Sequence, residues 1–593
     1  MEKIKILIKS IKLSLSLFYK TSRLWISVYF LLSITASTLG IASTYALKNL
    51  INSLTADSTV LKGIVLYAIV YIVILILVEC NNSIQNIVYD FTLKKAEHLY
   101  ESNLSKKLAE LPLSIIDSSE GKDLANDAKY AKNTVIYLTY QSVRVFTMAY
   151  TFTIAFSALV AFNFWFSFIL LGLSVPGIIL LLIYDRKSEN LRRKQAPDVR
   201  KFCYYRWMLT DPWPAKDVRM YNLTDHIQQR YNEVKGEYIL ANKRLDKKKL
   251  FSMLCAETIL RLGEIVFTFF VVLKSLSGEI GIGDVSLYIG LALTAVSSFE
   301  NFMHIALMTF TGTIDIISRV FDFYDIAANS NSGTRTLDKF KSLELKNVCF
   351  KYPHTDDLVL KGVSFKLEKG DKLSIVGING SGKSTIIKLI LGLYELQSGY
   401  ILINGYPMSD YDIRDVRKMY SVLFQDFVKY PLTLRDNVAL SDYDRASDDS
   451  AVISSLKQGG IYEELQGNTE NGLDSFMTKQ FDDKGIELSK GQWQKIAISR
   501  AYFKNADVLI FDEPSSALDA DAEDKMINNL KDMSDGKTCI MISHRMSAAR
   551  MSNKIIVIDN GVITECGSHN ELMAANGLYA KLYNLQKEKY TVR

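Results

Sequence analysis

The residues whose chemistry is easiest to read form one short stretch in the second half of the 593-residue chain. From Gly377 to Thr385 the sequence reads GINGSGKST, a glycine-rich loop that ends in Lys-Ser-Thr. Glycines let backbone N–H groups approach phosphate oxygens, the lysine neutralises phosphate charge, and the serine hydroxyl is a Mg²⁺ ligand. We therefore expect a nucleotide-phosphate site made of Gly377, Asn379, Gly380, Ser381, Gly382, Lys383, Ser384 and Thr385.

Two carboxylates about 130 residues further on could complete this site. Four apolar residues, VLIF at 508–511, lead directly into Asp512 and Glu513, as a buried strand would if it delivered both acids to the phosphates. Asp512 is expected to hold Mg²⁺ through water, and Glu513 to polarise the attacking water as a general base. Buried strands often end in acids, so it is the pairing with the glycine-rich loop that predicts hydrolysis.

Further residues resemble those of the ABC ATPases. Leu488 to Gln492 reads LSKGQ and resembles the LSGGQ signature of that family. In family order, Tyr352 stands at the adenine-stacking position, Gln425 in the Q-loop, residues 516–519 in the D-loop and His544 at the switch position. The resemblance covers essentially the whole chain.

The resemblance implies roles for these residues and a need for a partner. It implies ATP and Mg²⁺ as ligands, with two ATPase domains head to tail and each ATP between one glycine-rich loop and the other signature. The catalytic residues implied are Glu513, His544 and Gln425, the added nucleotide contacts are Tyr352, Ser489, Gly491, Gln492 and Asp519, and the metal ligands are Ser384, Gln425 and Asp512. A homodimer is the simpler reading, and a heterodimer is favoured if a partner chain supplies the missing signature glycine.

Lys490 departs from the signature, in which glycine is usual. Its charge at about 8 Å would be worth roughly 2 kcal/mol for each phosphate charge at an effective dielectric near 20, which would strengthen nucleotide binding. Alternatively, its side chain holds the signature away and slows hydrolysis. Because Glu513 and His544 are intact, we expect an active site.

Two kinds of element must position these residues. In the second half, residues 343–352 alternate like an edge strand, and LSIVG at 373–377 is a strand that leads into the glycine-rich loop and a helix. Before residue 310, six apolar stretches are long enough to span a bilayer, at about 24–47, 61–89, 137–161, 165–184, 254–274 and 285–310. Residues 4–20 suit a helix on the membrane surface.

The polar stretch after Phe323 marks the division between the two kinds of element. We expect a transmembrane domain at 1–326, a linker at 327–342 and an ABC nucleotide-binding domain at 343–593. The fold class is an α-helical six-span transmembrane domain plus an α/β P-loop ABC ATPase domain, the type I (type IV) exporter architecture.

Positive charge predicts the orientation in a plasma membrane. Lysine and arginine are abundant before the first span, between the second and third, and between the fourth and fifth, which places both termini and the ATPase domain in the cytoplasm. The two long basic connections carry helix breakers at 111–126 and 211–223, tips that could contact the ATPase domain. A net charge of only +6 and basic residues that flank apolar spans argue against nucleic acid as a partner.

Charged residues inside the spans are the clues to cargo. Each costs roughly 2.5–3.5 kcal/mol at a helix centre, so it must face a wet cavity or a partner. A polar translocation path would explain them, and so would mutual pairing or emergence into the cytoplasm. The residues of this candidate path are Arg144, Glu257, Arg261, Glu264, Glu300 and His304.

Residues 421–442 and 491–519 look like those of nisin-type lantibiotic exporters. This resemblance implies ATP-driven export of a modified precursor peptide by two half-transporters in the lipid bilayer. With no cysteine before Cys80, a fused leader-cleaving peptidase is not expected. Export of drugs or lipids is the alternative within transport, and an ATP-gated channel or regulatory membrane ATPase is the alternative from another class.

Overall fold

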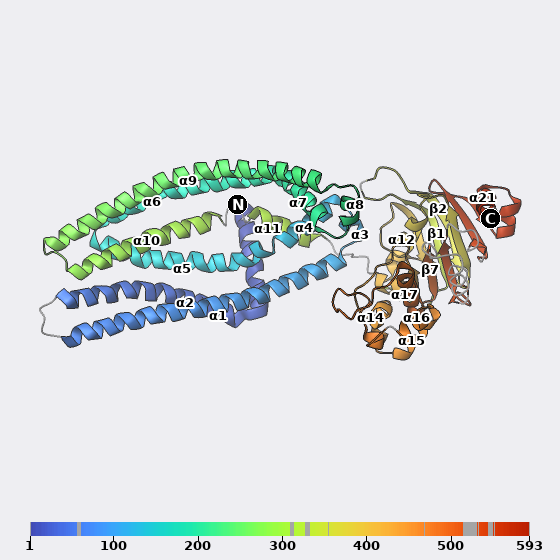
Figure 1. Ribbon diagram of the computed structural model, residues 1–593, viewed down its shortest axis with the longest axis horizontal. Coiled ribbons are helices and arrows are strands. Elements are labelled where there is room, and N and C mark those ends of the chain that lie inside the picture. Colours follow the sequence, from blue (N-terminus) through green and yellow to red (C-terminus); the bar gives the residue numbers. More distant parts are fainter. Residues whose placement is uncertain are drawn as a thin grey trace. The chain divides into compact units, whose positions relative to one another are not determined.

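The computed structural model of this protein describes residues 2–55, 61–308, 314–326, 333–353, 355–467, 469–513, 531, 533–543, 549–550 and 552–591. The chain divides into two compact units (Figure 1). The first comprises Met1–Ala109 and Asp123–Ile326, and the second comprises Glu110–Lys122 and Ala327–Arg593. A short segment from the first half of the chain, residues 110–122, is therefore part of the second unit.

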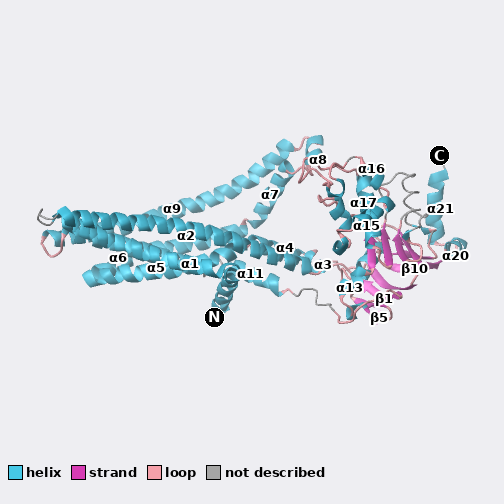
Figure 2. Ribbon diagram, turned by 90° about the horizontal axis from the view of Figure 1, so that it is seen from below, coloured by secondary structure: helices cyan, strands magenta, loops and turns pink. Residues whose placement is uncertain are grey.

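In the first unit, the regular structure of the described residues is helical (Figure 2). Two helix breaks fall at the expected tips, near Pro112 and at Pro212 to Pro214, because proline cannot donate to a helical hydrogen bond. The helices are α1 (Glu2–Thr55), α2 (Leu61–Glu110), α4 (Ser119–Tyr130), α5 (Lys132–Phe162), α6 (Phe164–Lys194), α7 (Ala196–Thr210), α8 (Ala215–Met220), α9 (Thr224–Leu276), α10 (Ile282–Met308) and α11 (Ile314–Asp325).

Five of the six expected spans lie in helices that are long and apolar enough to cross a bilayer, among the described residues. These helices are Arg23–Thr55, Leu61–Glu110, Lys132–Phe162, Phe164–Lys194 and Ile282–Leu307. The expected span at 254–274 is helical too, within α9, but Glu257, Arg261 and Glu264 interrupt its apolar run. The expected surface segment at 4–20 is the N-terminal part of α1, a helix that changes direction sharply before its apolar part (Figure 1).

Among its described residues, the second unit contains two sheets. One has four strands in the order β2 (Leu360–Glu368), β1 (Ser342–Phe350), β4 (Ser398–Ile403) and β5 (Tyr406–Pro407), all antiparallel. The other has six, in the order β10 (Val562–Gly567), β9 (Lys554–Asp559), β3 (Lys372–Gly377), β8 (Thr538–Ile542), β7 (Val508–Asp512) and β6 (Tyr420–Leu423). Only β10 is antiparallel to its neighbour in this second sheet.

The expectation that the strand at 343–352 is an edge strand is wrong, because β1 lies between β2 and β4. Alternation of apolar and polar residues reports that one face of a strand is buried, and it says nothing of the strand's place in the sheet. The expected strands at 373–377 and 508–511 are confirmed as β3 and β7.

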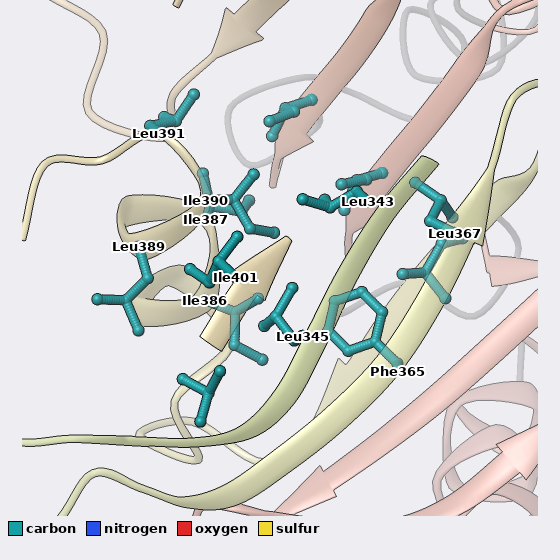
Figure 3. Close-up of a cluster of buried hydrophobic side chains, with 14 of the residues drawn as sticks. Leu343, Leu345, Phe365, Leu367, Ile386, Ile387, Leu389, Ile390, Leu391 and Ile401 are labelled. Carbon is teal, nitrogen blue, oxygen red and sulfur yellow. The ribbon is translucent and has the colours of Figure 1, made fainter. Parts of the chain in front are cut away.

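One apolar core holds both sheets and the helix that follows the glycine-rich loop (Figure 3). That helix, α12 (Lys383–Ile390), buries Ile386, Ile387, Leu389 and Ile390 against strands of both sheets. Each fully buried aliphatic side chain contributes about 1.5–3 kcal/mol, so α12 is firmly anchored. The other described helices of the unit are α3 (Leu113–Ile116), α13 (Ile413–Lys418), α14 (Leu434–Ala439), α15 (Asp449–Gln458), α16 (Tyr462–Gln466), α17 (Lys490–Lys504), α20 (His569–Ala574) and α21 (Leu578–Thr591).

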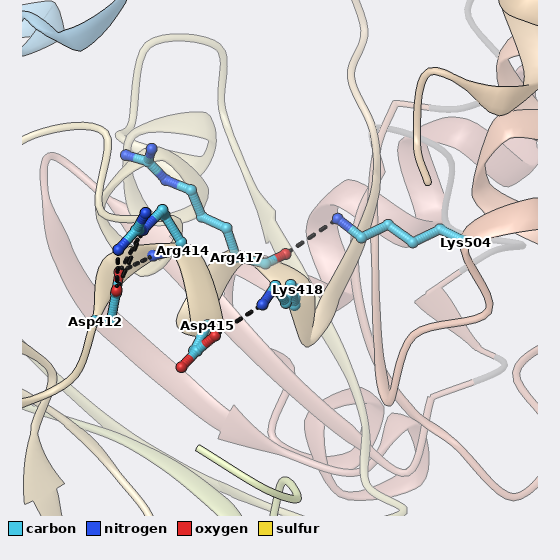
Figure 4. A network of polar contacts seen from close by, with 6 residues as sticks. All are labelled: Asp412, Arg414, Asp415, Arg417, Lys418 and Lys504. Carbon is cyan, nitrogen blue, oxygen red and sulfur yellow. Dashed lines mark hydrogen bonds and ion pairs between the residues drawn. The ribbon is translucent and has the colours of Figure 1, made fainter. Parts of the chain in front are cut away.

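Polar contacts of α13, which Figure 4 shows with Lys504, include two that fix the far end of α12. The Arg417 guanidinium donates hydrogen bonds to the carbonyls of Leu391 and Gly392, at 3.2 and 2.9 Å, directly after α12. Lys504, at the end of α17, donates to the Arg417 carbonyl at 3.1 Å. The helix behind the glycine-rich loop is thus held at its C-terminal end as well as along its apolar face.

Candidate active site

The glycine-rich loop lies at the carboxyl end of β3, and two of its positions have no room for a side chain. Gly377 has φ +157°, and a Cβ there would lie 2.1 Å from the Ile558 carbonyl oxygen. Gly382 has φ +104°, and its Cβ would lie 2.7 Å from a methyl carbon of Leu360. Both glycines are therefore required by the path of the backbone, which turns from strand to helix close to its neighbours.

Lys383 is the first residue of α12 and is 95% buried, with a relative exposure of 5%. Its ammonium donates to the carbonyl oxygens of Gly377 and Ile378, at 3.0 and 2.8 Å. Burial lowers the pKa of Lys383, and the nearby carboxylates of Glu513 and Asp512 oppose that shift. The loop thus encloses a cation that donates hydrogen bonds to two backbone carbonyls, with two carboxylates nearby, and a cation in this position is suited to an anionic ligand.

The Ser381 hydroxyl tests whether the loop fits phosphate. This side chain is 5% exposed, and its oxygen has no hydrogen-bond partner in the part of the chain that the structure describes. A buried hydroxyl without a partner costs about 1–3 kcal/mol, and a phosphate oxygen in the loop would remove that cost. Asn379 and Gly380, also in the loop, are exposed to solvent. The residues present therefore fit a nucleotide phosphate.

Asp512 is the last residue of β7 and lies beside the glycine-rich loop. In the sheet, β8 alone separates β7 from β3. It accepts a hydrogen bond from the Ser384 hydroxyl at 3.2 Å. Burial raises the pKa of Asp512 to about 6, the carboxylates of Glu513 and Asp426 add to that effect, and the bond from Ser384 opposes it. Because burial penalises the charged form of Asp512, a nearby cation would stabilise its carboxylate. Hydroxyl and carboxylate oxygens are ligands that Mg²⁺ prefers.

Glu513 follows at the end of the strand and has an unusual backbone conformation. Its φ is +50°, a left-handed value that costs an ordinary residue about 1–3 kcal/mol and is found at functional sites. The Gln425 amide donates to the Glu513 carboxylate at 2.7 Å. The structure thus joins these two predicted catalytic residues, although they are 88 positions apart in sequence.

The aromatic residue expected to stack on a base borders a separate cavity. Tyr352 shares a hydrogen bond with the Thr385 hydroxyl at 3.1 Å and contacts Tyr394 edge-on, with ring centroids 5.4 Å apart. A cavity of about 440 Å³ is lined by Tyr352, Tyr394 and Ser114, among others. The Tyr394 hydroxyl in turn donates to Asp117, which follows α3.

Three residues at the site were missed by the sequence reasoning. Asp426 could have been found as a second acid directly after Gln425. For Ser114 and Tyr394 the sequence offers only a weak indication, namely the prediction that the tip at 111–126 contacts the ATPase domain.

The signature-like residues begin α17. Ser489 caps the helix, and its hydroxyl accepts from the Gln492 N–H at 3.2 Å while the Gln492 side chain accepts from the Ser489 N–H at 2.9 Å. Lys490 is the first helical residue and is exposed, and Gly491 follows it in the helix. The helical conformation at position 490 suits lysine, so the local backbone does not call for glycine there.

Two predicted site residues, Asp519 and His544, lie outside the described residues. The roles assigned to them stay predictions.

The charged residues of the candidate path are partly brought together. Arg261 pairs with Glu257 and Glu264 on α9, at 2.8 and 2.7 Å. A cavity of about 230 Å³ is lined by Glu257 together with Glu300 and His304 of α10. Arg144, on α5, is not among the residues that line it.

Comparison with known families matches both units. Residues 26–299 match the family described as the ABC transporter transmembrane region, and residues 360–516 match the family described as ABC transporter.

Curated relatives align over most of the chain. The subtilin transport ATP-binding protein of Bacillus subtilis is 30% identical over 93% of this chain and 90% of its own length. The nisin transport ATP-binding protein of Lactococcus lactis subsp. lactis is 28% identical, over 92% and 90%. The ATP-dependent lipid A-core flippase of Methylobacillus flagellatus is 30% identical over 62% of this chain and 61% of its own.

A solved structure shares the fold. It is described as a bacterial Atm1-family ABC exporter with ATP bound, and it aligns with a TM-score of 0.76 at 22% sequence identity. The alignment covers 95% of this chain and 98% of that one.

Proposed function

The chain belongs to the ABC transporter family, and from that premise we propose that it is one half of an exporter for a modified peptide. Its ATPase domain hydrolyses ATP to drive transport, and its helical domain is a multi-pass membrane domain. The observation that carries the peptide cargo is the similarity to the subtilin and nisin transport proteins, which extends over both domains and more than nine-tenths of the chain.

Each residue of the site then has a proposed part in hydrolysis. Lys383 donates to phosphate oxygens in place of the two carbonyls that it contacts here. Ser384, Asp512 and Gln425 would hold Mg²⁺, which when bound would offset the charge on the phosphates. Glu513 orients and deprotonates the attacking water, and the Gln425 amide sets the direction of its carboxylate.

The remaining proposed contacts involve the base and the dimer. Tyr352 stacks on adenine from the wall of the 440 Å³ cavity. The exporter architecture requires a second half-transporter, and we take it to be an identical chain that presents its Ser489, Gly491 and Gln492 to the nucleotide. His544 contacts the terminal phosphate, and Asp519 lies at the dimer contact. The basic connections place both termini and the ATPase domain on the cytoplasmic side.

Reconstituted protein tests the proposal. In inside-out proteoliposomes, a cationic nisin-type modified precursor peptide is expected to raise ATP hydrolysis and to accumulate in the lumen only with ATP. Glu513→Gln should lower both rates by about 10²-fold or more, because a general base contributes at least that much. Glu470→Gln, an exposed acid paired with Lys484, is the matched control and should behave as wild type. Hydrolysis that is indifferent to peptides contradicts the cargo.

Export of a lipid is the second candidate function. It is favoured by the similarity to lipid A-core flippases, one of which is 25% identical over 85% of this chain. The same vesicles distinguish the two functions, because a lipid exporter would move a fluorescent amphipathic lipid between leaflets and would not accumulate peptide.

A further inference from the structure

We propose that the cavity between α6, α9 and α10 binds one protonated primary amine on an aliphatic stem, such as a lysine side chain. This deepens the proposed function, and its assignment to the cargo rests on that function. Leu173 and Ile178 of α6 and Met253 of α9 form part of the apolar wall, and the polar lining includes Glu257 and Glu300.

The size of the cavity selects a small group. Its volume of about 230 Å³ is below the roughly 300–1,000 Å³ of pockets that enclose drug-sized ligands. It exceeds the about 30 Å³ that one water occupies in the liquid by several times. One long side chain fits, with the rest of a larger molecule outside the cavity.

The charges on α9 and α10 select a cation. Arg261 neutralises only one of the two carboxylates that it contacts, Glu257 and Glu264. Glu300 forms no hydrogen bond or ion pair with any described residue, although it lies one helix away from those two acids. Carboxylates in an apolar helix segment are costly unless paired, and Arg261 is one cation against the three carboxylates Glu257, Glu264 and Glu300, so this side of the cavity has a net negative charge.

The charged groups on the other side of the cavity do not balance this negative charge. Asp185 of α6 pairs with Lys249 of α9 at 3.1 Å, so these two charges cancel. His304 lies 3.7 Å from the same Asp185 carboxylate. Even when His304 is counted as a cation beside Lys249 and Arg261, the four carboxylates of the region outnumber its cations.

An organic ammonium suits this site better than a metal ion. No group of three or more metal-ligating side chains is present among the described residues. An ammonium on a methylene chain would use both features of the cavity, since its head meets the Glu300 carboxylate while its stem packs on the apolar wall.

Two small probes test the cavity without any peptide. The full-length protein in lipid nanodiscs at pH 7 is titrated with n-hexylamine and with n-hexanol, a neutral analogue of similar size, and binding is measured by saturation-transfer NMR. Wild type is expected to bind the amine more tightly than the alcohol. Glu300→Gln should raise the Kd of the amine about tenfold, the effect of losing a hydrogen bond to a charged group, and leave that of the alcohol unchanged.

Two further variants complete the design. Glu300→Asp keeps the charge and should keep most of the preference for the amine. Glu79→Gln removes an exposed carboxylate on α2, outside the cavity, and should change neither Kd.

If Glu300→Gln weakens the binding of both probes equally, Glu300 has a merely structural role and the proposal is overturned. The proposal is also overturned if the wild-type protein does not bind the amine more tightly than the alcohol. Amine binding that depends on Glu300, in a protein that transports no peptide, would leave the cavity assigned and refute the proposed cargo. Peptide transport without amine binding would support the proposed cargo and refute the assignment of the cavity.

Discussion

Replacing Asp512, the acid proposed to hold Mg²⁺, should make the nucleotide-free protein more stable. Burial raises the pKa of Asp512 from 3.8 to about 6, so the folded protein binds this proton more tightly than the unfolded chain does. Above pH 6 the folded state bears the full cost of the charged form, and that cost shrinks as the pH falls toward 4. At about 1.4 kcal/mol per pH unit, the cost is at most about 3 kcal/mol at pH 7.5 and about 1.5 kcal/mol at pH 5.

Asp512→Asn removes the charge and keeps an oxygen to accept the bond from Ser384. At roughly 2–4 °C per kcal/mol for a domain of this size, the melting temperature of the ATPase domain should rise by up to about 6–12 °C at pH 7.5 and half as much at pH 5. With Mg²⁺ and ATP the order should reverse, because only wild type gains from binding them. Scanning fluorimetry at both pH values, with and without ligand, measures this.

Asp412→Asn is the control of opposite sign. The Arg414 side chain and its backbone N–H lower the pKa of Asp412 to about 2, so its charge stabilises the folded state above pH 3.8 and that benefit is lost only as the pH falls toward 2. This variant should be destabilised equally at pH 5 and pH 7.5. An Asp512→Asn protein no more stable than wild type at pH 7.5, or equally stabilised at both pH values, would refute the burial argument.

Three further variants follow from the geometry of the site. Gly382→Ala places a methyl group 2.7 Å from Leu360 at φ +104°, so fluorescent ATP analogues should bind at least about tenfold more weakly, by 1–3 kcal/mol of strain. Gln425→Ala removes the 2.7 Å bond to Glu513; the maximal rate of hydrolysis should fall about tenfold while ATP affinity, measured separately without Mg²⁺, changes little. Arg500→Lys loses guanidinium bonds made at 2.7–3.0 Å, so chemical denaturation should show about 2–4 kcal/mol less stability, and an unchanged midpoint would contradict this.

The parts of the site that lie within one continuous segment of the chain could be predicted from the local sequence. The run from β3 through the glycine-rich loop into α12 is set by its own residues, since strand, turn glycines and helix follow one another without a gap. The same holds for β7, which is apolar along its length and ends in Asp512. The fold of each domain follows from such segments together with the family resemblance.

Contacts between distant segments could not be predicted in this way. Tyr394 and Asp117 are 277 positions apart, and nothing in either neighbourhood indicates the other. The place of β1 inside its sheet also depends on β4, more than 45 residues later. Charges on α9 were visible in the sequence, but only the packing of three helices shows that Glu300 shares a cavity with one of them.

The membership of residues 110–122 in the second unit has a consequence for biosynthesis. After Lys122, the ribosome must add 204 residues, 123 to 326, before the first residue of the rest of that unit is made. At about 5–20 residues per second this takes roughly 10–40 s. The hydrogen bond between Asp117 and Tyr394 can form only after this delay, so residues 110–122 join a unit whose other residues are synthesised much later.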